Sequence, residues 1–158
     1  MESKNMQMKW IDTKIAELNL TNFMMFHDLK LRFSRGVNVI SGENSTGKTA
    51  VLKLLYASLK AMVLAEKERN PSAEVREQHF VKKFQGVFRP DGFSIGRLVS
   101  RQQGVGSAVI EIGFFNDGHC RIGFSSRHKN HVELDYDSEL SLMLSDPVYI
   151  PPKEIISS

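Results

Sequence analysis

The chain has 158 residues, the size of one globular domain, and 41% of them are hydrophobic, which is enough to form a core. Its single cysteine, Cys120, excludes an internal disulfide and a cysteine-based metal site, and no apolar run approaches the ~18 residues that span a membrane. Since the N-terminus also lacks the apolar core of a signal peptide, we expect a cytoplasmic protein without membrane contact. A net charge of +3 permits a nucleic-acid partner without indicating one.

The predicted elements begin after a polar, methionine-rich stretch over residues 1–12, which we expect to be a loose tail. Apolar and polar residues then alternate over residues 14–21 and 29–33, as they do in strands buried on one face. A turn at residues 34–36 leads into Val37-Asn38-Val39-Ile40, a β-branched run that predicts a short buried strand. Three strands are therefore expected before the first helix.

The next stretch, Gly42-Glu43-Asn44-Ser45-Thr46-Gly47-Lys48-Thr49, matches the phosphate-loop pattern G-x-x-x-x-G-K-[ST] that connects a strand to a helix. Its glycines let the backbone approach a ligand, and its amides form an anion-binding nest at the positive end of the helix dipole. Lys48 is expected to reach the β- and γ-phosphates, and the Thr49 hydroxyl to coordinate Mg²⁺. The predicted contacts with a Mg²⁺-nucleotide are Gly42, Glu43, Asn44, Ser45, Thr46, Gly47, Lys48, Thr49 and Ala50.

The residues after this loop predict two helices. Apolar residues over 51–62 recur at helical spacing, and the charged run that follows ends at Asn70-Pro71, where proline stops a helix. Ser72 is a suitable N-cap for a second helix, which gives a helical connection over residues 72–86. Strands, loop and first helix thus occupy residues 14–69.

The second half of the chain is predicted to be mostly β. Residues 109–114 and 121–124 flank Asn116-Asp117-Gly118, a strong hairpin signal, and a third strand follows at 131–136. A β insert is therefore expected over residues 107–137. Two further elements end the expected order, a short helix over 138–144 and an apolar returning strand over 147–151.

This order of parts is similar to the N-terminal half of an ABC-type ATPase head of the RecF/SMC/OLD group of P-loop NTPases. Residues 18–26 resemble the opening strand of that group, and residues 36–44 resemble its approach to the phosphate loop. The resemblance implies a mixed α/β (α+β) fold, an ABC-ATPase-like lobe with an antiparallel β subdomain over residues 13–158. Three stretches also resemble bacterial AAA-family ATP-binding proteins of the same group: 87–91, 96–99 and 149–154.

The resemblance also implies ligands and partners. ATP and Mg²⁺ would bind at the loop, two heads would associate through the nucleotide, and the role would be DNA maintenance or defence. Phe26 or His27 would approach the base or ribose, with a packed aromatic and a surface histidine as open alternatives. Arg97, or else Arg89 or Arg101, would reach the phosphates, with an ordinary exposed arginine as the alternative for each.

Hydrolysis in this group requires motifs that the sequence lacks: four apolar residues followed by Asp-Glu, a Ser-Gly signature, and a switch histidine. The nearest approach to the acidic motif is interrupted by Asn116, and only Glu154 stands near the expected position of the Mg²⁺-sensing glutamine. We therefore expect little hydrolysis by this chain alone. Two explanations stay open: a fragment that a C-terminal half completes, which the order of elements favours, or a short protein that binds nucleotide without turning it over.

A second function is a nucleic-acid or protein interaction module, because basic residues gather in and near the β insert. They are not interleaved with exposed aromatics, however, and Glu133 and Asp135 follow closely. A small-molecule kinase or a GTPase is a third possibility, which the antiparallel opening disfavours. The basic residues of the second hypothesis are Arg97, Arg101, Arg121, Arg127, Lys129 and His131.

Overall fold

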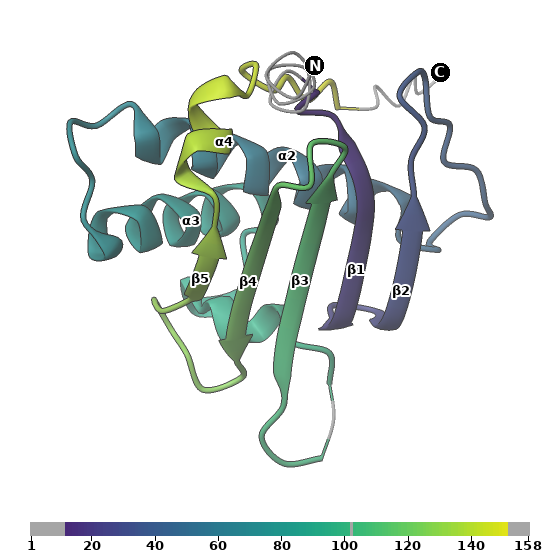
Figure 1. The fold of residues 1–158 in the computed structure, drawn as a ribbon. Helices are drawn as coiled ribbons and strands as arrows, with labels where there is room; N and C mark the ends of the chain where they lie inside the picture. Colours follow the sequence, from purple (N-terminus) through teal and green to yellow (C-terminus); the bar gives the residue numbers. More distant parts are fainter. Residues whose placement is uncertain (1–11, 102, 152–158) are drawn as a thin grey trace, which may run out of the picture.

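A computed structural model describes residues 12–101 and 103–151, so the predicted tail up to residue 11 and Glu154 lie outside the described residues. A single sheet stands in front of the helices α2 and α3, and its other face carries no helix among the described elements (Figure 1). No described helix is long and apolar enough to cross a membrane. The helical elements are α2 (Lys48–Glu66), α3 (Ala73–Phe88), α4 (Ser138–Met143) and the 3₁₀ turns η1 (Asp91–Phe93) and η2 (Ile95–Leu98).

The sheet is antiparallel throughout, with strand order β2-β1-β3-β4-β5. Its central strand pairings join the two halves of the sequence, because Leu20 lies opposite Leu29 on one side and Ile110 on the other. The predicted β insert therefore continues the N-terminal hairpin in one sheet, and the mixed α/β prediction is confirmed. The strands are β1 (Ile15–Phe23), β2 (Phe26–Arg32), β3 (Ser107–Phe114), β4 (His119–Ser125) and β5 (Glu133–Tyr136).

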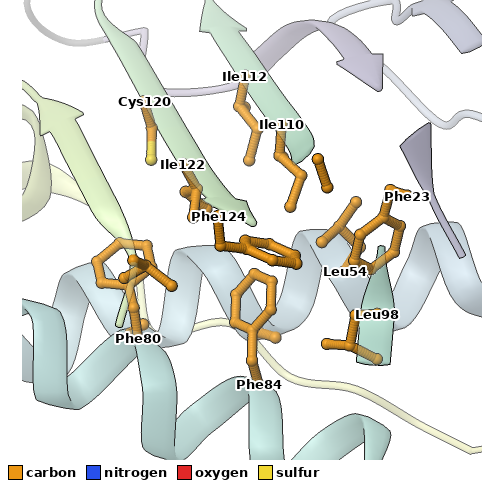
Figure 2. Packing of buried hydrophobic residues seen from close by; sticks show 14 of the residues in the cluster. Phe23, Leu54, Phe80, Phe84, Leu98, Ile110, Ile112, Cys120, Ile122 and Phe124 are labelled. Atoms are coloured by element: carbon orange, nitrogen blue, oxygen red, sulfur yellow. The ribbon is translucent and has the colours of Figure 1, made fainter. Parts of the chain in front are cut away.

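The core lies between the sheet and the two long helices (Figure 2). Alternation along the strands directs Leu20, Ile110 and Ile122 inward, where they are fully buried. The ring of Phe124 meets that of Phe23 edge-on, with ring centroids 6.5 Å apart. Cys120 is also buried in this layer, and burial raises the pKa of its thiol, so it packs as a small apolar side chain.

The helix predictions are confirmed with small differences in their ends. The first helix ends at Glu66 rather than continuing through the charged run to residue 69. Ser72 is the N-cap of α3, as predicted, because its Oγ accepts a hydrogen bond from the Val75 amide at 3.3 Å. That helix extends two residues past the predicted end, to Phe88, and stops where Arg89 adopts a left-handed conformation (φ 48°).

Two predicted strands are wrong. Residues 37–40 and 147–150 pair with no strand that the structure describes, and apart from the partly buried Ile40 their β-branched side chains face solvent. Val37 and Val39 are 90% and 84% exposed, and Val148 and Ile150 are 83% and 84% exposed. A β-branched apolar run indicates a buried strand only when a neighbouring strand and a covering layer are present, and neither is present in the described fold.

Candidate nucleotide site

The predicted phosphate loop leads directly into α2 and packs on the turn between β1 and β2. Gly47, the N-cap residue of α2, is buried and adopts a left-handed conformation (φ 91°). A Cβ atom at Gly47 would lie 2.3 Å from Cζ of Phe26 and 2.7 Å from the sulfur of Met25. Glycine is therefore required here both by the backbone conformation and by the closeness of the loop to the turn.

The loop presents unpaired amides at the start of a 19-residue helix. Val51 donates its amide to the carbonyl of Gly47 at 3.0 Å, so the amides that precede Val51 in the first turn lack intrahelical acceptors. Within the described chain, no backbone hydrogen bond uses the amides of residues 44–47. No acidic side chain occupies the first turn either, so the arrangement suits an external anion.

Two polar side chains order the loop from within. The Lys48 ammonium donates to the carbonyl oxygens of Gly42, at 2.7 Å, and of Glu43. The Thr46 hydroxyl donates to the same Glu43 carbonyl at 2.8 Å. The Lys48 charge therefore lies beside the free amides, and the exposed Thr49 hydroxyl stands in the first turn of α2.

A cavity of about 370 Å³ opens beside this loop, and its lining combines two chemically different groups of residues. The polar group consists of loop residues with Lys48 and Lys53. The apolar group consists of Met24, Met25 and Phe88. Such a lining suits a ligand that has both a polyanionic part and a flat apolar part, and it contains no carboxylate.

Six of the nine predicted contacts line the cavity: Asn44, Ser45, Gly47, Lys48, Thr49 and Ala50. Gly42, Glu43 and Thr46 belong to the loop without lining it. Phe26 packs beneath Gly47, and the His27 ring nitrogen Nδ1 lies 3.5 Å from the hydroxyl of Ser100, so neither lines the cavity.

The sequence alone did not identify the apolar lining residues of this cavity, Met24, Met25 and Phe88. Met24 and Met25 belong to the stretch that resembled an opening strand, but nothing in their spacing marked them as lining residues. Phe88 lies at the end of α3, forty residues after Lys48, and reaches the cavity only through tertiary packing. No local pattern in the sequence could have found it.

Arg97 is not brought to the phosphate loop. It lines a second cavity of about 630 Å³ together with Arg101, and no residue of the loop lines that cavity. The two cavities share Met24 and Phe88 as walls. Arg89, the third arginine considered, caps α3 and lines neither cavity.

Two other basic residues of the predicted interaction module, Arg121 and His131, lie on different sides of the sheet. Arg121 lies on the open sheet face, where its Nε is 3.7 Å from a Glu111 carboxylate oxygen and its strand partner is Asp135. His131 contacts the Glu77 carboxylate at 2.5 Å, on the helical side. Each of these two residues is therefore placed beside a carboxylate that offsets positive charge locally.

Comparison with known proteins places this loop and sheet in a family. A model described as an AAA domain matches residues 17–141, from β1 to α4. The chain belongs to this AAA domain family. The matched residues include the loop and every residue that lines the two cavities, whereas residues 147–150 lie outside the match.

Curated relatives of this AAA domain confirm the predicted RecF/SMC-type group. The DNA replication and repair protein RecF of Bacillus cytotoxicus is 35% identical over 81 residues, which are 51% of this chain and 21% of that protein. The DNA double-strand break repair Rad50 ATPase of Archaeoglobus fulgidus is 25% identical over 83 residues, 52% of this chain and 9% of that protein. RecF of Nitrosococcus oceani is 43% identical over 42 residues, 27% of this chain and 12% of that protein. The matched segment is about a fifth or less of these relatives.

Proposed function

We propose that this AAA domain binds Mg²⁺-ATP at the loop of residues 42–49. The observation that carries the proposal is the set of unpaired amides at the start of α2, with the Lys48 ammonium beside them and a cavity in front. Backbone amides and a lysine in this arrangement bind phosphate oxygens, and the Thr49 hydroxyl would be the protein ligand of Mg²⁺. Met24, Met25 and Phe88 would contact the base.

We also propose that the domain binds nucleotide without hydrolysing it efficiently by itself. The cavity lining holds no carboxylate that could polarise water or supply a second Mg²⁺ ligand. In this proposal, turnover needs groups from a C-terminal half or a partner ATPase head. The named roles of RecF and Rad50 in DNA repair suggest a cytoplasmic ATPase of DNA maintenance or defence.

In this proposal the partner docks on two exposed apolar pairs, Val37 with Val39 and Val148 with Ile150, which together are called the apolar strip. The four exposed side chains lie outside a groove of about 580 Å³ over α2, but their neighbours Asn38, Ile40 and Pro147 line it. Exposed apolar side chains next to such a groove are typical of an interaction surface. In this proposal, residues 37–40 and 147–150, which pair with no described strand, serve to contact a partner.

Calorimetric titration of Mg²⁺-ATP into the chain, the Lys48→Ala variant and the Lys82→Ala variant tests the proposed site. Lys82 is an exposed lysine of α3 outside the cavity lining and matches the change in charge. We expect equal binding by the chain and Lys82→Ala, and at least about tenfold weaker binding by Lys48→Ala, because a charge-assisted contact contributes ~1.5–3 kcal/mol. Equal affinities in all three proteins, or no binding by any, would contradict the proposal.

A further inference from the structure

The second cavity, which is lined in part by η2, contains side chains that can bind anions. Arg97 and Arg101 are both exposed, and neither has an ion pair with any residue in the described ranges. Ser100 and Ser126 add hydroxyl groups, and Asp91 is the only carboxylate in the lining. The cavity therefore carries an excess of positive charge and free guanidinium donors.

The backbone that carries these arginines is firmly placed. Gly96 donates its amide to the carbonyl of His128 at 2.8 Å, and a Cβ on Gly96 would lie only 2.5 Å from the carbonyl oxygen of Ser126. On the other side of Arg97, the Ser100 amide donates to the carbonyl of Asn22 at 2.7 Å. Arg97 thus lies between Gly96 and Ser100, whose amides are both hydrogen-bonded to other segments, and Arg101 directly follows Ser100.

We propose that this cavity is a phosphate-binding site separate from the phosphate loop, with Arg97 and Arg101 as its charged ligands. Guanidinium groups present planar pairs of donors that match phosphate oxygens, and their charge does not depend on pH in the physiological range. A cavity of about 630 Å³ exceeds the volume of one phosphate and accommodates several linked phosphates, as in a nucleic-acid strand or a small polyphosphate.

The site is joined to the nucleotide cavity by shared structure. Met24 and Phe88 line both cavities, and the Met24 amide donates to the carbonyl of Leu98 at 2.7 Å, next to Arg97. The neighbouring Met25 contacts the Gly47 position of the phosphate loop. A ligand that moves the segment from Leu98 to Arg101 therefore acts on the turn that supports the loop.

The experiment measures binding of a short fluorescein-labelled oligothymidylate by fluorescence anisotropy in the Lys48→Ala background, which removes the loop lysine. The test variant adds Arg97→Gln and Arg101→Gln. The matched control adds Arg121→Gln and Arg127→Gln, which change the net charge equally but lie outside the cavity lining. Unlabelled pyrophosphate is then added as a competitor, to distinguish a site for small phosphates from a site for a strand.

We expect the Arg97/Arg101 variant to bind the oligonucleotide at least tenfold more weakly than the control. The slope of log affinity against log salt should fall by about 1.4, the value for two phosphate contacts on a single strand. Displacement by pyrophosphate would identify a small-polyphosphate site, and its failure a strand site. Equal losses in the two double variants, or no binding of either probe, would overturn the proposal.

The phosphate-binding site and the nucleotide proposal can fail separately. Neither Arg97 nor Arg101 lines the nucleotide cavity. With Lys48 intact, Arg97→Gln/Arg101→Gln should therefore keep the Mg²⁺-ATP affinity of the unmodified chain within about twofold, a difference below ~0.5 kcal/mol that is usual for a surface substitution. A larger loss of Mg²⁺-ATP affinity in this variant would place the arginines in the nucleotide site and overturn their assignment to a separate one.

Discussion

At the scale of single residues, Gly47 joins the phosphate loop to the fold. Its left-handed backbone and its contact with Phe26 leave no room for a side chain. We predict that Gly47→Ala abolishes nucleotide binding and lowers the free energy of unfolding by roughly 1–3 kcal/mol, because strain and a steric clash act together. Urea denaturation and Mg²⁺-ATP calorimetry measure the two effects.

The control for this prediction is a second glycine with open surroundings. Gly86 lies within α3, and a Cβ there would meet nothing within 4 Å. Gly86→Ala should raise the free energy of unfolding by about 0.5–1 kcal/mol, because alanine has the higher helix propensity. Similar effects of the two substitutions would show that the Gly47 environment is not the one described.

Residues of the loop were predictable from sequence because the motif encodes a local backbone shape. Gly42, Gly47 and Lys48 act through geometry that eight consecutive residues define among themselves. The apolar lining of the cavity was not predictable from sequence, because Met24 and Phe88 come together only when the sheet packs on α3. The position of Arg97 was not predictable for the same reason, because η2 is held by contacts with residues 126–128, which are distant in the sequence.

At the scale of elements, an ion pair attaches the segment after α4 to α2. The Lys60 ammonium donates to the Asp146 carboxylate, and Lys67 lies 3.9 Å from its other oxygen. The Tyr149 ring packs on Tyr56 of α2, with ring centroids 5.8 Å apart. The Lys60 hydrogen bond, with smaller contributions from neighbouring lysines, lowers the pKa of Asp146.

We predict that acid releases this segment. A carboxyl group with a lowered folded-state pKa stabilises the contact above its unfolded pKa of about 3.9, and the contribution is lost as pH falls through the lower folded value. The Tyr149 ring resonances, followed by NMR, should therefore shift below about pH 4. In Asp146→Asn they should already hold the low-pH position at pH 7, and an unchanged titration in that variant would contradict the assignment.

Helices were easier to predict than strands for a physical reason. The Ser72 cap and the apolar face of α2 are local signals, because they depend on residues three or four positions apart. Strand formation depends on distant partners. Residues 15–23 became β1 because β2 and β3 flank them, whereas residues 37–40, although they are no less apolar, have no such neighbours among the described strands.

At the scale of the whole molecule, apolar side chains are distributed unevenly. The core buries its large side chains almost completely, yet the apolar strip of Val37, Val39, Val148 and Ile150 remains open to solvent beside the α2 groove. Exposed apolar residues that occur singly are ordinary, but a strip with an adjoining groove favours association. Both failed strand predictions thus fall on exposed apolar pairs whose neighbours line the same groove.

We predict that Val37→Ser/Val39→Lys leaves the free energy of unfolding within about 0.5 kcal/mol of the original value, because these side chains already face water. Leu54→Ala, at a fully buried position of α2, should lower it by ~2–5 kcal/mol. Urea denaturation at low protein concentration compares the three chains.

If the strip is an interaction surface, the double variant should also remain monomeric at concentrations where the original chain associates, as light scattering after size-exclusion chromatography would record. Marked destabilisation by the double variant would show that residues 37–40 pack within the domain, and unchanged association would remove the strip from the proposed docking surface.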